Sequence, residues 1–273
     1  FNAACFDPSG CFVTVDQAWN YDVRDTSFSE FKAHYKLLSE YGYKNSDWAA
    51  LLSKPDSEND NMYEFNLDSR RIRAFSDKIL VTVTTEHVIF NAFERINSKR
   101  FWSETYNFMV VDPYEGRVVS KFGHYPEIYK RRHIPSFYEY HVDVSEDRLF
   151  TGYAADTLIY VRDLSGKPIE AFGRSFEGFD DRFPENSSFS DYEATFRKYK
   201  AEQAYYQDIK VVGGLVFRTY KKAFDRGYGV QVYKDYSLIA DIPFDESVRI
   251  IGTIDGLYYA VAPADVENDV YRI

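Results

Sequence analysis

The chain repeats one short pattern, in which turn-forming residues are followed by a run of apolar and β-branched residues. Asp7-Pro8-Ser9-Gly10 precedes the first run and Asp255-Gly256 precedes the last. The runs cover residues 11–15, 79–83, 148–151, 215–220 and 257–261. Runs that start directly after a turn predict β-strands. Because they are almost continuously apolar instead of alternating, we expect both faces of each sheet to be covered.

A second kind of hairpin lies between these runs, with an apolar strand, an Asp-containing turn and a strand that leads away. Its copies cover residues 62–75, 108–122, 159–172 and 230–242, and a further one begins at 270–273. The two hairpin types alternate, so together they give a repeated four-stranded antiparallel unit. Such a unit cannot bury both of its apolar faces alone, and radial stacking of units buries them. The sequence therefore predicts an all-β fold, a β-propeller of four-stranded antiparallel blades, in a single domain over residues 1–273.

A β-sandwich is the competing architecture for the same strands. Its strands would alternate between apolar inward and polar outward residues. The continuous apolar runs weigh against this alternative.

Helical insertions are predicted near residues 27–53 and 189–206. Ser27 and Glu30 have the spacing of a capping box, and an apolar stripe of period 3.6 follows them to residue 38. A second short helix is expected between Ser46 and Pro55. The segment that begins at Ser190 repeats the capping-box spacing.

Composition narrows the range of partners. The 273 residues include 43 acidic and 33 basic side chains, so the formal net charge is −10. Nucleic-acid binding needs clustered Lys and Arg, so we expect no nucleic-acid partner. No apolar run approaches the roughly 20 residues that span a bilayer, so no membrane span is expected in this sequence.

Several segments resemble one blade of an NHL-type or TolB-like six-bladed propeller. The resemblance is carried by residues 142–150, 158–167 and 171–173, and similar fragments occur at 6–13 and 110–123. It implies six blades, although only five inner hairpins are visible, so five blades is the alternative. Proteins of these families are often exported lipoproteins without a known role. The resemblance thus implies a periplasmic or cell-surface protein of the cell envelope, with a lipid anchor upstream of the printed sequence.

A basic run, Lys130-Arg131-Arg132, stands beside His133 in this acidic chain. Arg is suited to bidentate contacts with a carboxylate or sulfate. Aromatic rings of Tyr138 and Tyr140 follow closely and offer a face for stacking. The predicted binding site is therefore Arg131, Arg132, His133, Tyr138 and Tyr140, for a small anionic or saccharide ligand or a protein partner. The alternative for the basic run is a solvated loop that pairs with acidic surface.

Motifs for catalysis are missing from the sequence. No nucleophile elbow, no Gly-rich phosphate loop and no metal-ligand spacing of His occurs. We therefore predict no catalytic residue, no metal and no cofactor. Cys5 and Cys11 flank one turn, and the sequence leaves open whether they are bridged.

The predicted function is an exported ligand- or protein-binding module or scaffold. The alternative is a metal-dependent, lactonase-like hydrolase, because six-bladed propellers include calcium-dependent lactonases with an axial site. Residues placed to point there include His141, Asp143, Asp208 and Lys210. A third class, a structural interaction partner, would show a broad apolar surface patch.

Overall fold

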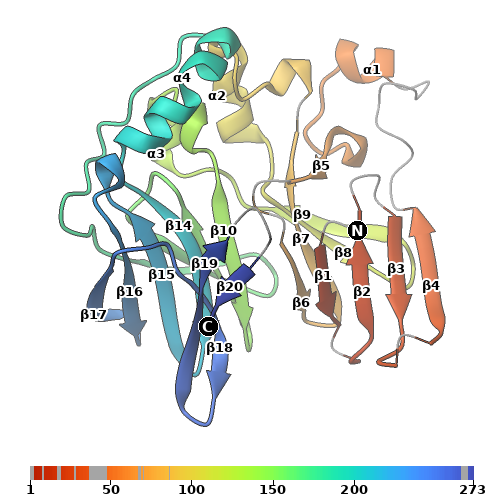
Figure 1. Cartoon of the computed structure of the whole chain (residues 1–273). Coiled ribbons are helices and arrows are strands. Elements are labelled where there is room, and N and C mark those ends of the chain that lie inside the picture. Colours follow the sequence, from red (N-terminus) through yellow and green to blue (C-terminus); the bar gives the residue numbers. More distant parts are fainter. Residues whose placement is uncertain are drawn as a thin grey trace. The chain divides into compact units, whose positions relative to one another are not determined.

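The computed structural model describes residues 3–7, 9–16, 20–27, 29–36, 48–66, 69, 71–85, 87–265 and 270–273 (Figure 1). Contacts divide the chain into two compact units. Unit 1 is Phe1–His133 with Ser187–Phe189, and unit 2 is Ile134–Asn186 with Ser190–Ile273. The single domain expected from the sequence stays a prediction.

Unit 1 holds two antiparallel sheets, each a meander of neighbouring strands. The first contains, in order, β1 (Ala3–Phe6), β2 (Phe12–Val15), β3 (Asn20–Arg24) and β4 (Phe31–Lys36). In the second sheet, β5 (Glu64–Phe65) and β6 (Ile72–Phe75) both pair with β7 (Lys78–Thr84), each along a different part of it. Strand β8 (Phe108–Asp112) pairs with the other edge of β7, and β9 (Arg117–Phe122) pairs with β8. The helical elements are α1 (Trp48–Ser53), η2 (Asp60–Met62), η3 (Val88–Phe90), α2 (Arg95–Glu104) and α3 (Glu127–Arg131).

Unit 2 holds three antiparallel sheets. The strands of the first are β10 (Tyr140–Ser145), β11 (Arg148–Tyr153), β12 (Ile159–Asp163) and β13 (Pro168–Phe172). Those of the second are β14 (Tyr205–Val212), β15 (Leu215–Lys221), β16 (Tyr228–Lys234) and β17 (Ser237–Phe244). The third contains β18 (Arg249–Ile254), β19 (Leu257–Asp265) and β20 (Val270–Arg272). The helical elements are η4 (Pro135–Phe137), η5 (Ala223–Asp225) and α4 (Phe189–Glu202), whose first residue is grouped with unit 1.

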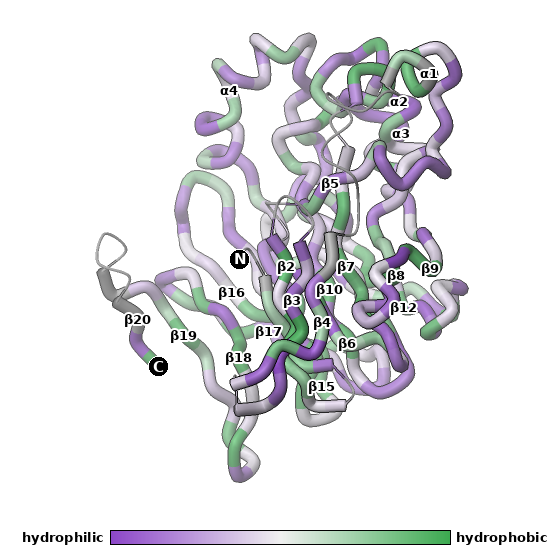
Figure 2. The backbone as a smooth tube through the Cα atoms, turned by 90° about the vertical axis from the view of Figure 1, so that its right-hand side faces the viewer, coloured by the Kyte–Doolittle hydropathy of each residue, from purple (hydrophilic) through white to green (hydrophobic). Residues whose placement is uncertain are grey.

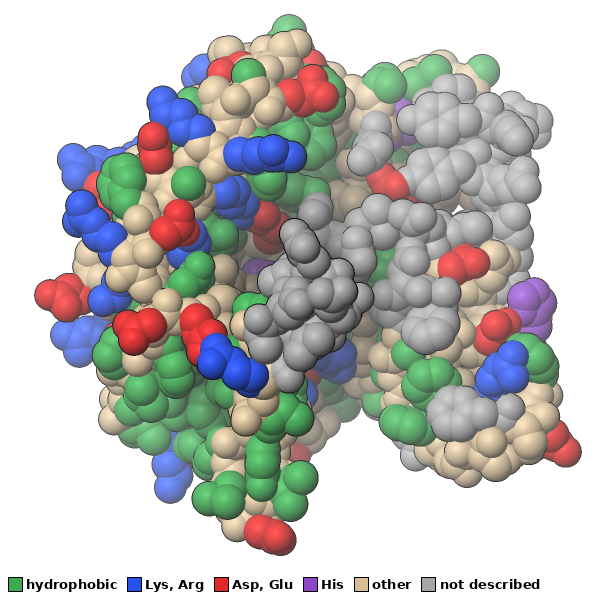
Figure 3. Space-filling model, viewed as in Figure 1, with side chains coloured by type: hydrophobic (Ala, Val, Ile, Leu, Met, Phe, Trp, Pro, Cys, Tyr) green, Lys and Arg blue, Asp and Glu red, His purple; other side chains and the backbone are tan. Residues whose placement is uncertain are grey.

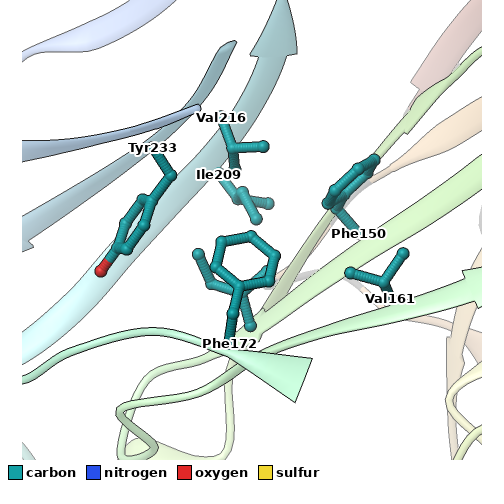
Figure 4. Close-up of a cluster of buried hydrophobic side chains, with 7 residues drawn as sticks. Phe150, Val161, Phe172, Ile209, Val216 and Tyr233 are labelled. Carbon is teal, nitrogen blue, oxygen red and sulfur yellow. The ribbon is translucent and has the colours of Figure 1, made fainter. Parts of the chain in front are cut away.

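The sheets of unit 2 pack face to face. Phe150, Val161 and Phe172 of sheet β10–β13 meet Ile209, Val216 and Tyr233 of sheet β14–β17 in one buried cluster (Figure 4). A second cluster joins the opposite face of β14–β17 to β18 and β19. The first strands also touch in succession, β10 with β14 and β14 with β18. This is the stacking that the two-sided apolar strands predict for propeller blades.

Burial explains the continuous apolar runs. Strands β7, β11 and β15 are almost entirely buried, because each lies between neighbours within its sheet and is covered on both faces. The last strands, β9, β13 and β17, are largely exposed. The hydropathy of these strands can be followed in Figure 2. Strands occur where all five turn-bounded runs predict them, in β2, β7, β11, β15 and β19.

The helix expected from residue 28 to residue 38 is wrong. Residues 31–36 form strand β4, which pairs with β3. The stretch Phe31-Lys32-Ala33-His34 alternates with a period of two, as a strand does. The carboxylate of Asp25 accepts hydrogen bonds from the Ser29 and Glu30 backbone N–H groups, so this stretch closes a turn between strands instead of capping a helix. Phe28 and residues 37–47 lie outside the described part.

Other expected elements can be located. Helices stand at Trp48–Ser53 and at Phe189–Glu202, where the sequence expects the second and third helix. The described residues form five sheets, and the blade number of six, with five as the alternative, stays a prediction. Cys5 and Cys11 are free thiols. Within the described residues, no helix is both long and apolar enough to cross a membrane.

Candidate functional site

The basic run lies at the end of α3 in unit 1. Arg131 is 75% exposed, and its Nε lies 3.3 Å from Oε1 of Glu127, one helical turn earlier. Lys130 Nζ lies 4.0 Å from the same carboxylate. Arg132 ends the helix, where its backbone N–H bonds to the Ile128 carbonyl, and His133 is buried. The charge of the run is thus partly balanced inside its own helix.

The two tyrosines of the predicted site belong to unit 2. Tyr138 is half-buried after η4. Tyr140 begins β10 and is fully buried, with its ring centroid 5.9 Å from that of Tyr153. A buried ring is poorly placed to offer a face to a ligand. The five predicted residues are divided between the two units, and the binding role of the set stays a prediction.

Three of the residues considered for an axial catalytic set, Asp143, Asp208 and Lys210, take part in ion pairs. Lys210 Nζ on β14 lies 3.1 Å from Asp143 Oδ2 on β10, and the Val211 backbone N–H donates to the same oxygen. Arg249 Nε on β18 lies 3.3 Å from Asp208 Oδ2 on β14. Each pair therefore joins neighbouring first strands. Within the described part of the chain, no three His, Cys, Asp or Glu side chains are grouped as metal ligands would be.

A groove of about 650 Å³ lies in unit 2 beside the second of these pairs. Its apolar wall contains Ile251, Val261 and Pro263 from β18 and β19. Asp208, Arg249 and Thr219 are among its polar lining residues. Small-molecule sites are concave, with apolar walls, a few polar groups and volumes of roughly 300–1,000 Å³. The groove has this character.

Arg249 is the exposed cation of the groove. Its side chain is 65% exposed, whereas that of Asp208 is 10% exposed. The distance to Asp208 is made by Nε, and a guanidinium carries four further N–H donors on Nη1 and Nη2. A half-exposed ion pair contributes about 0–1 kcal/mol of stability. The guanidinium therefore keeps donors for an added anionic group.

The groove continues into one face of the β18–β19 hairpin, which we call the open face. Strand alternation places Ile254, Leu257, Tyr259 and Val261 on it, and Ile251 joins them at a bulge. Ile251, Ile254 and Leu257 are 46%, 62% and 64% exposed. Hydrophobic side chains gather at the lower end of β18 and β19 in Figure 3. The open face is thus an exposed apolar patch next to a groove.

In the neighbouring hairpin β14–β15, the positions that flank the turn are covered by the next sheet. Val212 and Leu215 flank the turn of hairpin β14–β15, and both pack in the cluster with Val248 and Ile250 of the next sheet. Ile254 and Leu257 flank the turn of β18–β19 at the equivalent positions, yet both are exposed. Among the described residues of unit 2, no other sheet packs on these two positions, and the sequence expectation of two covered faces stays a prediction for this hairpin.

Comparisons with known proteins support the fold. No family model matches the chain, and no curated protein matches its sequence. The structure of a DUF4221 family member from Bacteroides vulgatus is similar, with a TM-score of 0.63 and 13% identity over 92% of this chain and 69% of that chain. A putative exported protein from Bacteroides fragilis gives a TM-score of 0.52 and 14% identity over 97% of this chain and 66% of that one. The Dos1 propeller gives 0.45 and 11%, over 95% of this chain and 52% of that one.

These likenesses concern the fold alone. The chain spans about two thirds of the length of the two Bacteroides proteins and about half of the Dos1 propeller. The more specific TolB-like or NHL-like resemblance stays a prediction. Meander sheets that stack face to face in unit 2, together with the likeness to the DUF4221 structure, show that the chain has the all-β fold of a β-propeller.

Proposed function

We propose that the chain is a binding module that holds its partner on the open face of β18–β19 and in the adjoining groove. One observation carries the proposal: apolar positions that the neighbouring hairpin packs against the next sheet are covered by no other described sheet of unit 2 here, and they lie beside a groove of about 650 Å³. Exposed apolar patches of this kind mark interaction sites. The propeller then acts as the scaffold that holds this surface in place.

The chemistry of the surface indicates what it binds. Ile251 and Leu257 favour an apolar group, and the half-exposed guanidinium of Arg249 favours a negative charge beside it. Arg forms charge-assisted hydrogen bonds with carboxylates and similar anions. The expected partner therefore presents an apolar body with an anionic group, as part of a small molecule or of a protein.

The cellular location of the protein is also part of the proposal. The Bacteroides fragilis neighbour is described as a putative exported protein. We take this as support for export of this chain to the periplasm or cell surface. Cell fractionation of the host tests it, and recovery in the cytoplasm alone would contradict it.

A titration with 1-anilinonaphthalene-8-sulfonate tests the site, because this probe joins aromatic rings to a sulfonate. Dilute protein is titrated and the affinity is read from the probe's fluorescence. Arg249→Ala is expected to weaken binding about tenfold or more, since a hydrogen bond to a charged group contributes about 1.5–3 kcal/mol. Ile251→Ser is expected to weaken it through the lost apolar contact.

Arg226→Ala serves as the control, because it removes an exposed Arg from another hairpin of unit 2. Its affinity should equal that of the unmodified chain. Equal affinity of Arg249→Ala, Ile251→Ser and the unmodified chain, with unchanged melting, would overturn the proposed site.

A further inference from the structure

We propose that Glu139, Phe137 and Tyr205 form a binding site for a primary alkylammonium group, and that the side chain of Lys200 fills this site until a ligand replaces it. The site differs from that of the proposed function in its residues and in the charge of its ligand. All four residues belong to unit 2, so the site is formed within one unit.

The ammonium group of Lys200 is enclosed by a carboxylate and by aromatic rings. Its Nζ lies 2.6 Å from Oε1 of Glu139. The same nitrogen lies 4.2 Å from the ring centroid of Tyr205, 4.9 Å from that of Phe137 and 5.9 Å from that of Phe196. A cation within about 6 Å of a ring centroid is attracted by the negative face of the ring, which is how aromatic cages bind ammonium ligands. Lys200 thus occupies the kind of place that an ammonium ligand would take.

The carboxylate and two of the rings are held in place without helix α4. Phe137 in η4 is fully buried, and its ring centroid lies 4.7 Å from that of Phe183. Glu139 directly precedes β10, and its carbonyl accepts a hydrogen bond of 3.0 Å from the Ala154 backbone N–H. Tyr205 begins β14. These residues therefore keep their positions when the side chain of Lys200 leaves.

The carboxylate of Glu139 has room for a second donor. Its Oε1 atom faces Lys200, whereas its Oε2 atom is buried and has no hydrogen-bond partner among the described residues. A buried acceptor without a donor is unfavourable. An alkylammonium ion carries three N–H donors and, because it is not tied to a helix, it can approach both oxygens. This favours a primary ammonium over a quaternary one, which has no N–H to donate.

Lys200 can leave the site while α4 stays in place. Its ammonium is carried by a flexible four-carbon stem, so rotation within the side chain is enough to withdraw it. The neighbouring Lys221 Nζ lies 5.7 Å from the Tyr205 centroid, but it is held by two carbonyls of α4 and by Asp225 at 3.0 Å. A ligand must therefore compete with Lys200 alone, and its apparent affinity is lowered by the fraction of chains in which the site is filled.

Calorimetric titration with n-butylammonium tests the site, because this ion matches the side chain of lysine. Lys200→Ala empties the site, and it is expected to bind n-butylammonium about tenfold or more tightly than the unmodified chain does. 1-Butanol has the same carbon chain without the charge, and no binding is expected. Tetramethylammonium is expected to bind more weakly than n-butylammonium, and equal affinity would overturn the assignment to a primary ammonium.

Two variants serve as controls. Lys198→Ala removes an exposed lysine from the same helix, and it should bind n-butylammonium like the unmodified chain. Glu139→Gln keeps the shape of the site and removes its negative charge. Added to Lys200→Ala, it is expected to weaken binding about tenfold or more, because the bond to a charged acceptor is lost. Equal affinities of Lys200→Ala and Lys198→Ala, or an affinity that Glu139→Gln leaves unchanged, would overturn the inference.

Nuclear magnetic resonance of the unmodified chain gives a test that does not depend on the stability of Lys200→Ala. Lysine is labelled with ¹³C at Cε, and the signal of Lys200 is identified by its absence from Lys200→Arg. The nearby rings are expected to shift this signal away from those of exposed lysines. A large excess of n-butylammonium is expected to move it to the position of exposed lysines. A Lys200 signal that stays in place would show that the ligand does not replace this side chain.

Discussion

At the scale of single residues, Arg218 on β15 is the most unusual side chain of unit 2. It is fully buried, and its guanidinium donates to the backbone carbonyls of Tyr153, Asp156 and Thr157, with 2.6 Å between Nη1 and the Thr157 oxygen. It also lies 3.2 Å from the ring centroid of Tyr206. Burial lowers the pKa of Arg218. The charge therefore holds the loop between β11 and β12 against the next sheet.

Replacing this side chain tests its role. Arg218→Met is expected to lower the free energy of unfolding by about 3–5 kcal/mol, because it leaves buried carbonyls without donors. Urea unfolding measures the change. Arg226→Ala, at an exposed position, should alter stability by less than about 0.5 kcal/mol. An Arg218→Met variant as stable as the unmodified chain would show that the guanidinium does not hold the loop.

At the scale of elements, helix α4 is fixed by charged contacts more than by apolar burial. None of its residues is buried. Lys221 of β15 is 6% exposed, and its Nζ donates to the carbonyls of Lys200 and Ala201 at 3.0 Å each. Lys200 in turn lies 2.6 Å from the carboxylate of Glu139. A cation at the last carbonyls also suits the negative end of the helix dipole.

Removing the Lys221 ammonium should release the end of α4. Lys221→Met is expected to speed amide hydrogen exchange at the last turn of α4 and to lower stability by about 1–3 kcal/mol, since its bonds are charge-assisted. Exchange measured by mass spectrometry reports the effect. Lys222→Met changes the adjacent residue and is expected to leave α4 protected. Equal exchange in both variants contradicts the role of Lys221.

The elements also show which parts of the fold can be predicted from the sequence. Strands after turns are predictable because the turn residues and the apolar runs are local signals, as in β15 and β19. The error at β4 arises because Ser27 and Glu30 fit a capping box, while pairing with β3 decides the structure. The groove could not be predicted, because Asp208 and Arg249 are distant in sequence and meet only when β14 and β18 lie together.

At the scale of the whole molecule, buried and half-buried phenols and a half-buried thiol make the free energy of unfolding depend on pH in the alkaline range. Burial raises the pKa of Tyr205 to about 12 and that of Tyr206 to about 12. It also raises the pKa of Cys5 to about 12. These groups stay protonated in the folded chain while the unfolded chain loses their protons near pH 9 to 10, so the unfolded state binds fewer protons.

The free energy of unfolding is therefore expected to fall as pH rises from about 9 toward 12. Urea unfolding at pH 8, 10 and 11 measures this decrease. Tyr206→Phe removes one ionisable group and should reduce the slope between pH 10 and 11. A stability that stays constant from pH 8 to 11 contradicts the prediction.

The uncovered side of hairpin β18–β19 has a further consequence for how unit 2 opens. When sheets are stacked, each one is stabilised mainly by its direct neighbours. Within the described residues of unit 2, sheet β14–β17 has such a neighbour on both sides, whereas β18–β20 shares a hydrophobic cluster with β14–β17 on one side. Local unfolding should then begin at β18–β20 and reach β14–β17 later, so stability declines along the stack. A partner that binds the open face of β18–β19 would therefore protect β18–β20 against local unfolding.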